Sequence, residues 1–115
     1  MPLLYKIVPA SLWREAERTG RFDGSAVDIK DGFIHFSTAA QAEETAARHF
    51  AGQSDLLLLS VDADALGAAL KWEPSRGGAL FPHLYGQLAL AAVRKVEPLP
   101  LGLDNRHVFP PLQAP

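Results

Sequence analysis

The first third of the chain has a pattern of apolar and polar positions that predicts one strand and one helix. Residues 3–8 form a short β-prone apolar run, which predicts a first strand. From residue 10 to residue 19 the apolar positions share one helical face, and Pro9 and Gly20 stand where a helix commonly begins and ends. Residues 21–30 are mostly polar and are predicted to form a loop.

A second strand and a second helix are predicted next. Residues 33–37 alternate, so that Phe33, His35 and Ser37 share one face of a strand. Thr38 and the glutamine three residues later form the sequence signature of a capping box, which predicts that a helix begins here.

The second half of the chain is dominated by strand patterns. Residues 55–61 contain four consecutive leucines and are predicted to form a buried central strand. Residues 69–73 and 90–96 predict two more strands, and residues 74–78 predict a flexible loop between them. The segment after residue 98 is rich in proline and is expected to lie extended on the surface.

This order of elements predicts an α+β fold with a split mixed sheet and two main helices. The chain has 115 residues, enough for one domain, so we expect a single domain over residues 1–98 and an extended C-terminal tail over residues 99–115.

Composition narrows the function classes. The formal net charge is -2, which argues against generic nucleic-acid binding. There are no cysteines, so a disulfide framework, a thiolate nucleophile and a zinc site built on sulfur are excluded. The sequence shows neither the pattern of a signal peptide nor an apolar run long enough to cross a bilayer, so we expect a cytoplasmic protein with no membrane partner.

The first candidate for chemistry is the segment 32–38. His35 and Ser37 share a strand face directly before a helix N-terminus, where an imidazole, a hydroxyl and free backbone N–H groups favour an anion. The alternative is that Ser37 or Thr38 only caps the helix and that His35 is a hydrogen-bonded core histidine.

Two further segments hold candidate residues. Residues 81–86 place His83 and Tyr85 between Pro82 and a glycine, on a rigid loop suited either to catalysis or to closing the end of a sheet. Glu73 ends a strand and can stabilise a developing cation, or can simply pair with Arg76. Arg76, Lys6 and Asp28 complete the candidate ligand-binding residues, although a lone Asp28 is also typical of a turn.

Two other combinations of these candidate residues have weaker support from the sequence. His35, His83 and Glu73 could form a metal site of two histidines and one carboxylate, but their spacing matches no local metal signature. Ser37 and His83 could form a nucleophilic pair, but Ser37 lacks the glycines of a nucleophile elbow. We therefore assign no metal ligand.

Taken together, the segments Asp31-Gly32-Phe33-Ile34-His35-Phe36-Ser37-Thr38, Trp72-Glu73 and Phe81-Pro82-His83-Leu84-Tyr85-Gly86 resemble the domain of unknown function 952 family. The resemblance extends to about residue 98. It implies a fold similar to that of the ADP-ribosyltransferases, in which a split sheet surrounds a nucleotide cleft. The tRNA 2'-phosphotransferases of that group carry a His-aliphatic-Ser strand, which is similar to His35-Phe36-Ser37.

The resemblance also implies roles for the candidate residues, with NAD as the substrate. His35 and Ser37 would hold ribose hydroxyls or a phosphate, and Tyr85 would pack on a ring. Glu73 would stabilise the oxocarbenium-like state, and His83 would act as acid or base.

The sequence has no clear arginine set, and Lys6 stands where such enzymes often have His or Arg. This difference favours an alternative, a non-catalytic module that binds a nucleotide or another small phosphorylated metabolite. In a third reading the motifs are purely structural.

Overall fold

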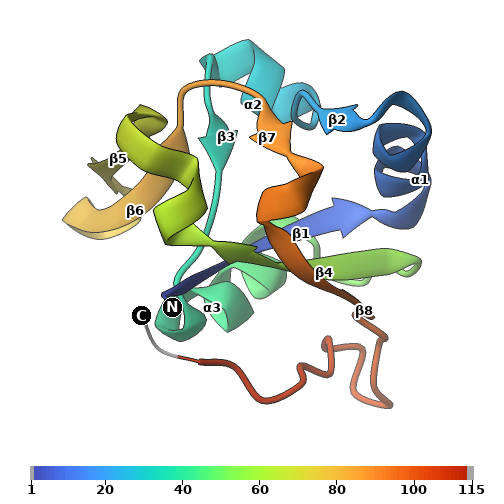
Figure 1. The fold of residues 1–115 in the computed structure, drawn as a ribbon. Coiled ribbons are helices and arrows are strands. Elements are labelled where there is room, and N and C mark those ends of the chain that lie inside the picture. Colours follow the sequence, from blue (N-terminus) through green and yellow to red (C-terminus); the bar gives the residue numbers. More distant parts are fainter. Residues whose placement is uncertain (1, 114–115) are drawn as a thin grey trace.

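The computed structural model describes residues 2–113, except for the side chain of Arg76 (Figure 1). Its strands are β1 (Leu3–Pro9), β2 (Arg21–Phe22), β3 (Ile34–His35), β4 (Leu56–Asp62), β5 (Leu70–Ser75), β6 (Ala79–Leu84), β7 (Leu88–Ala89) and β8 (Val93–Pro98). Its α-helices are α1 (Ala10–Thr19), α2 (Ala26–Asp31) and α3 (Ala39–His49), and its short 3-10 helices are η1 (Ala63–Ala69), η2 (Arg76–Gly78) and η3 (Leu90–Ala92).

The two main helices occur where the sequence predicted them. Helix α1 ends at Gly20, which adopts a left-handed conformation with φ 88°. Helix α3 begins after Thr38 with a complete capping box, in which the Thr38 side chain and the Gln41 side chain each satisfy a backbone N–H group.

The strands form three antiparallel sheets with the orders β1-β4-β8, β2-β7 and β3-β6-β5. The prediction of an α+β fold is therefore confirmed, but the prediction of a mixed sheet is wrong for the described residues. Apolar patterns identify which segments become strands, but they do not determine whether distant strands pair in parallel or antiparallel. Strand β4 is the central strand of its sheet, as the leucine run predicted.

A short stretch after β3 joins the first and third sheets. Tyr5 and Ser37 exchange two backbone hydrogen bonds of 2.8 Å, and the Phe36 N–H donates to the Pro82 carbonyl at 3.0 Å. The chain thus pairs with β6 at His35 and has moved to β1 at Ser37. This crossing gives the fold its split-sheet character.

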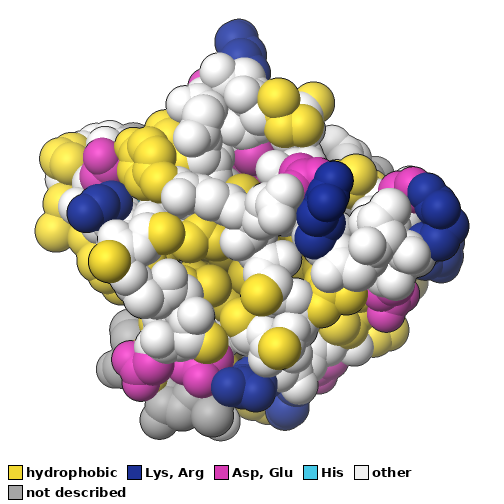
Figure 2. Space-filling view, turned by 45° about the horizontal axis from the view of Figure 1, so that its top comes forward, with side chains coloured by type: hydrophobic (Ala, Val, Ile, Leu, Met, Phe, Trp, Pro, Cys, Tyr) yellow, Lys and Arg dark blue, Asp and Glu magenta, His cyan; other side chains and the backbone are white. Residues whose placement is uncertain are grey.

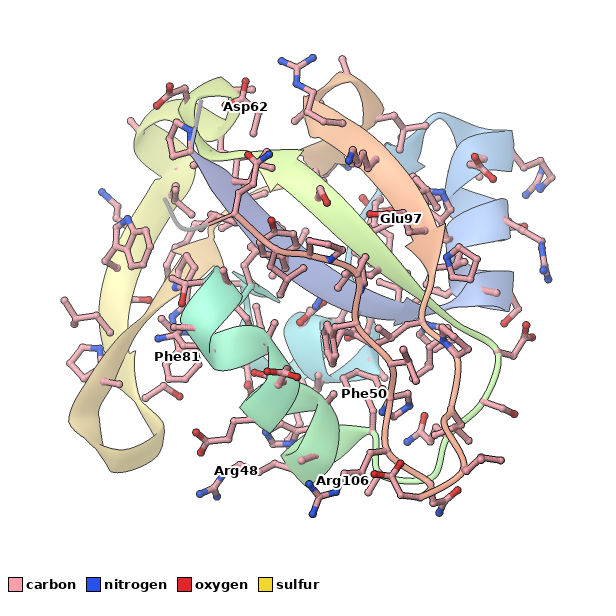
Figure 3. All side chains as sticks on the ribbon, turned by 90° about the horizontal axis from the view of Figure 1, so that it is seen from below. Arg48, Phe50, Asp62, Phe81, Glu97 and Arg106 are labelled. Atoms are coloured by element: carbon pink, nitrogen blue, oxygen red, sulfur yellow. The ribbon has the colours of Figure 1, made fainter. Side chains whose placement is uncertain are left out.

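The β1-β4-β8 sheet has a hydrophobic core on each side. Alternate β1 residues such as Leu4 and Val8 face the larger core, which includes Trp13 of α1. The other face carries Tyr5 and Ile7, and it is covered by α3 together with the segment after β8. Figure 3, seen from below, shows α3 and this C-terminal segment lying side by side across the sheet.

The C-terminal tail has no helix or strand over its described residues, 99–113. It is nevertheless not simply laid on the surface, because Leu99 is buried and Phe109 and Leu112 pack against the second core. The Gln113 N–H also donates to the Tyr5 hydroxyl at 2.8 Å.

Three local predictions are wrong. Residues 81–86 are not a loop throughout, because β6 continues to Leu84 and places His83 in a strand. Residues 21–30 are not a loop, because β2 and α2 form there and a Ser25–Asp28 capping box begins α2. Residues 90–92 form η3 before the last strand, so β8 starts at Val93.

Within residues 2–113, none of the helices has the length and apolar character needed to cross a membrane. On the face shown in Figure 2, cationic and acidic side chains are interspersed around apolar ones and form no field of a single sign.

Candidate functional site

One face of the β3-β6-β5 sheet brings together side chains from motifs that are far apart in sequence. His83 of β6 lies opposite His35 of β3 on one side and opposite Lys71 of β5 on the other. Opposite residues, and residues two apart on a strand, share a face. We call this surface the histidine face; its members are Phe33, His35, Lys71, Glu73, His83 and Tyr85.

Aromatic contacts hold the histidine face together, with Phe33 at their centre. The Phe33 ring stacks on the His83 imidazole with centroids 4.1 Å apart and also contacts His35 at 4.6 Å. The Tyr85 ring lies 5.2 Å from Phe33, and the two imidazoles meet edge to face at 5.4 Å. The two histidines therefore share one surface, which every functional interpretation of the sequence requires.

Glu73 orients His83. One Glu73 oxygen, Oε1, lies 2.8 Å from His83 Nδ1 and accepts a 2.7 Å hydrogen bond from the Tyr85 hydroxyl. The hydrogen bond with His83, followed by that with Tyr85, lowers the pKa of Glu73 below its usual value, and the Glu73 hydrogen bond raises the pKa of Tyr85. Because an ionised carboxylate only accepts, His83 donates through Nδ1–H, and a neutral His83 has its lone pair on Nε2.

Asp28 is the buried hydrogen-bond acceptor beneath His35. It is 1% exposed, and its carboxylate lies 2.6 Å from His35 Nδ1 and 3.0 Å from the Lys6 ammonium. It also accepts from the backbone N–H groups of His35 at 3.2 Å and Ser25 at 2.8 Å. Burial by itself would raise the pKa of Asp28, but the His35 hydrogen bond and the Lys6 charge outweigh it and hold this pKa well below its ordinary value.

Lys6 acts inside the fold. Its ammonium group is buried, pairs with Asp28 and donates a 2.9 Å hydrogen bond to the His35 carbonyl. Burial lowers the pKa of Lys6, against the opposing effect of Asp28. Lys6 and Asp28, both predicted as ligand-binding residues, therefore contact His35 from behind and position it.

Gly24 permits this arrangement. It has φ 114°, and a Cβ atom there would lie 2.7 Å from the Cβ of Asp28. Close approach of the backbone to Asp28 thus requires glycine at this position.

His35 also has a second acidic partner. Its Nε2 atom lies 3.0 Å from the Oδ2 atom of Asp31, the last residue of α2. Both ring nitrogens of His35 therefore face carboxylates, one buried and one 40% exposed.

The structure does not bring every predicted site residue to the histidine face. The Ser37 hydroxyl is buried and lies 2.8 Å from the Thr45 hydroxyl of α3, because the chain has already crossed to β1 at this point. The side chain of Arg76 lies outside the described part of the structure. Within that part, no group of three or more His, Asp or Glu side chains has the arrangement of a metal site.

Three members of the site escaped the sequence analysis as functional residues, although each had a signal. Phe33 shares the strand alternation of His35, and Lys71 lies two residues before Glu73 on the same strand face. Asp31 precedes His35 by four residues, but that spacing acquires meaning only when α2 and β3 pack together.

Two hollows in the described part of the molecule lie elsewhere. They have volumes of about 570 and 430 Å³, and both lie between α3 and the C-terminal segment, lined in part by Glu43 and Phe109. No residue of the histidine face lines them, so that face is a surface bordered by α2 rather than a wall of these cavities.

Fold and site together define a small α+β protein that carries a carboxylate-supported histidine pair on an antiparallel sheet. The chain belongs to the family described as Protein of unknown function (DUF952), whose model matches residues 7–96. The family resemblance predicted from the motifs is thus confirmed.

Solved structures of one relative support this assignment. The X-ray structure of protein CC0527 from Caulobacter crescentus is 52% identical, has a TM-score of 0.89, and aligns over 92% of this chain and 93% of its own. The solution NMR structure of CC0527 is 53% identical with a TM-score of 0.83, over 92% of this chain and 91% of its own. No curated protein matches the sequence.

Proposed function

We propose that the histidine face binds a small molecule with a flat ring and performs acid–base chemistry on it, with NAD-dependent ADP-ribosyl or phosphate transfer as the leading reaction class. The ligand class is a nucleotide, and generic nucleic acids and membranes are not partners. The protein is proposed to act in the cytoplasm.

The observation that carries this proposal is the geometry of His83. Its Nδ1 atom faces Glu73, one side of its ring is stacked on Phe33, and the edge of His35 lies beside it. A carboxylate that fixes the tautomer of an imidazole is a common device for preparing the other nitrogen for proton transfer. His83 is only 5% exposed, and among the described residues its Nε2 has no hydrogen-bond partner, which suits a group that acts on a ligand.

The remaining members of the face supply the other functions that such a reaction needs. Tyr85 is 45% exposed beside Phe33 and can pack on a nucleobase or a nicotinamide ring. Glu73, ionised and partly exposed, can stabilise positive charge that develops on a ribose as nicotinamide leaves. His35 can donate a hydrogen bond or a proton to a ribose hydroxyl or a phosphate.

The split arrangement of the sheets is consistent with an ADP-ribosyltransferase-like fold, which we extend to this chain as part of the proposal. In that view residues 1–98 form the functional domain and residues 99–115 form a C-terminal tail. The role of Ser37 in such a site is limited to a supporting contact, since the Ser37 hydroxyl already pairs with Thr45, and Arg76 is kept as a proposed ligand-binding residue.

A non-catalytic binding module is the second candidate, and one observation favours it. Lys6 is buried and neutralised by Asp28, so the cation on the first strand is directed into the fold. A protein of this type would retain ring and anion recognition and lack turnover.

Thermal unfolding with NAD, ADP-ribose, nicotinamide and nucleoside phosphates tests both candidates. A ligand at 100 times its dissociation constant adds about 2.7 kcal/mol and shifts the midpoint by several degrees. The shift should disappear in His83→Gln and persist in Glu97→Gln, a matched substitution on β8 away from the site. No shift with any of these ligands would refute the proposed site.

Release of nicotinamide from NAD then separates the two candidates. A catalytic site predicts release that Glu73→Gln abolishes and Glu97→Gln leaves intact. Ligand binding without release across a panel of acceptors would instead establish the binding module.

A further inference from the structure

His35 is held between two carboxylates that approach opposite ring nitrogens. Nδ1 lies 2.6 Å from Asp28, and Nε2 lies 3.0 Å from Asp31. A neutral imidazole has a single N–H and could donate to one of them; an imidazolium donates to both. Only the imidazolium form of His35 can therefore donate to both carboxylates at once.

The two carboxylates differ in how firmly they are held. Asp28 has a fully buried side chain and accepts from Lys6 and from two backbone N–H groups in addition to His35. Asp31 is 40% exposed, and within residues 2–113 its side chain has no ion-pair partner other than His35. Loss of Asp31 would thus leave His35 oriented by Asp28 with Nε2 available.

The Asp31 side chain is 40% exposed at the end of a helix, so its displacement from His35 requires no opening of the core. Asp31 ends α2, whose only buried residue is Asp28. Gly32 follows with φ 86°, and a Cβ atom there would have no neighbour within 4 Å. Helix α2 therefore depends on a polar anchor at Asp28, and its last residue is not fixed by packing.

The charges around His35 favour an anion once Asp31 is displaced. The cations are Lys6, protonated His35 and Lys71, and the other anions are Asp28 and Glu73, while His83 and Tyr85 complete the face without charge when neutral. With Asp31 the charges of this group sum to zero, and without it the group has a net charge of one positive unit.

We infer that His35 Nε2 is an oxyanion subsite of the histidine face, and that Asp31 occupies it until a phosphate or carboxylate group of the ligand displaces the Asp31 side chain. The inference rests on the proposed function for the position of the rest of the ligand, on the Phe33 and Tyr85 side of the same face. Asp31 then acts as an internal competitor that selects for anionic ligands.

The test is a titration with inorganic phosphate at constant ionic strength and mildly acidic pH, followed by the imidazole ¹⁵N and ¹H resonances of His35. Asp31→Asn should bind phosphate about fivefold more tightly than wild type, the factor expected when a partly exposed ion pair stops competing. Asp23→Asn removes another surface carboxylate, 52% exposed, and should leave the affinity within about twofold. In the double variant Asp31→Asn/His35→Gln the backbone amide resonances of residues 31–36 are followed instead, and phosphate should no longer shift them as it does in Asp31→Asn.

Unchanged or weaker binding by Asp31→Asn, or an equal gain in Asp23→Asn, would overturn the subsite. A parallel titration with acetate identifies the class of oxyanion: an equal gain indicates any carboxylate or phosphate, and a gain with phosphate alone indicates a phosphate ligand. The fold of each variant is checked by its backbone amide spectrum, and Asp31→Ser serves as a second variant if Asp31→Asn is poorly folded.

Adenosine and nicotinamide, which carry no phosphate, separate this inference from the proposed function. If they perturb Phe33 and Tyr85 while phosphate leaves His35 unchanged, the subsite is wrong and the ring site stands. If phosphate binds as expected and neither ring ligand nor NAD binds, the subsite stands and the proposed function is wrong.

Discussion

At the scale of single residues, Asp28 does the most to organise this protein's candidate site. Its carboxylate joins β1 through Lys6, β3 through His35 and the start of α2 through the Ser25 N–H. A buried carboxylate is costly unless its charge and hydrogen-bonding capacity are satisfied, and here both are. Stability and imidazole orientation therefore depend on the same group.

Asp28→Asn should lower the free energy of unfolding by about 3 kcal/mol at pH 7, because it leaves the buried Lys6 ammonium without its anion. Urea unfolding monitored by circular dichroism measures this change. The exposed Asp23→Asn control should stay within about 0.5 kcal/mol of wild type, and a similar loss in both variants would contradict the role of Asp28.

The stability that Asp28→Asn removes should depend on pH, and the direction of that dependence follows from the pKa of Asp28. The pKa of Asp28 is lower in the folded chain than in the unfolded chain, so the unfolded state takes up the proton first as the pH falls. The stability from Asp28 is complete above the unfolded value of about 3.9 and is lost progressively below it. The difference between wild type and Asp28→Asn should therefore shrink in unfolding curves measured below pH 4, and a constant difference would argue against this linkage.

Gly24→Ala tests the close backbone approach to Asp28. A Cβ at residue 24 meets both a left-handed φ of 114° and the Asp28 Cβ at 2.7 Å, whereas at Gly20 it meets a φ of 88° and open space. We expect Gly20→Ala to cost about 1 kcal/mol from backbone strain alone and Gly24→Ala to cost about 2 kcal/mol more from the steric conflict. Equal losses in chemical denaturation would show that the backbone relaxes around Asp28.

At the scale of elements, the pairing of β3, β6 and β5 creates the histidine face. His35 and Glu73 belong to segments 38 residues apart, and they share a face because both strands pair with β6 in one register. A slip of one residue would place Ile34 and Leu84 on this face and turn His35 and His83 to the opposite face of the sheet.

The cross-strand bonds of Glu73 make a testable prediction for titration. Tyr85→Phe removes one of the two hydrogen bonds that lower the pKa of Glu73, so this pKa should rise toward the usual value while the larger effect of His83 remains. In the reciprocal variant Glu73→Gln, the pKa of Tyr85 should fall toward its ordinary value. Carboxyl and ring ¹³C resonances followed against pH report both, with Glu97 as an internal control; an unchanged Glu73 titration in Tyr85→Phe would contradict the bond.

The helices and strands also show which features of the fold and of the site the sequence predicts and which it does not. Strand alternation placed Phe33 and His35 on one face, and the capping box located the start of α3, because both signals are local. Helix α2 was missed although Ser25 and Asp28 carry the same capping signature, since the polar composition of residues 21–30 outweighed it. The pairing of His35 with His83, the burial of Lys6 and the turn of Ser37 toward Thr45 depend on contacts between distant segments, which no local pattern contains.

At the scale of the whole molecule, the β1-β4-β8 sheet separates two cores that are covered unequally. Helix α1 and much of the chain's second half cover one side, whereas α3 covers only part of the other. The face of α3 toward the sheet is formed by Ala42 and Ala46, whose small side chains allow close packing but bury little apolar area. The C-terminal tail supplies the remaining cover.

This arrangement predicts that the tail stabilises the fold. Substituting alanine for Phe109 and Leu112 together should lower the free energy of unfolding by about 3 kcal/mol, roughly half the cost of the same truncations at fully buried sites. Leu103→Ala is the matched control, because Leu103 lies in the same tail and is fully exposed, and it should change stability by less than about 0.5 kcal/mol. If the double variant unfolds like the control in urea, the second core is complete without the tail. If it is destabilised as expected, the lower face of the sheet that carries Tyr5 and Ile7 needs both α3 and the C-terminal segment, and the hollows between them are spaces within one packed layer.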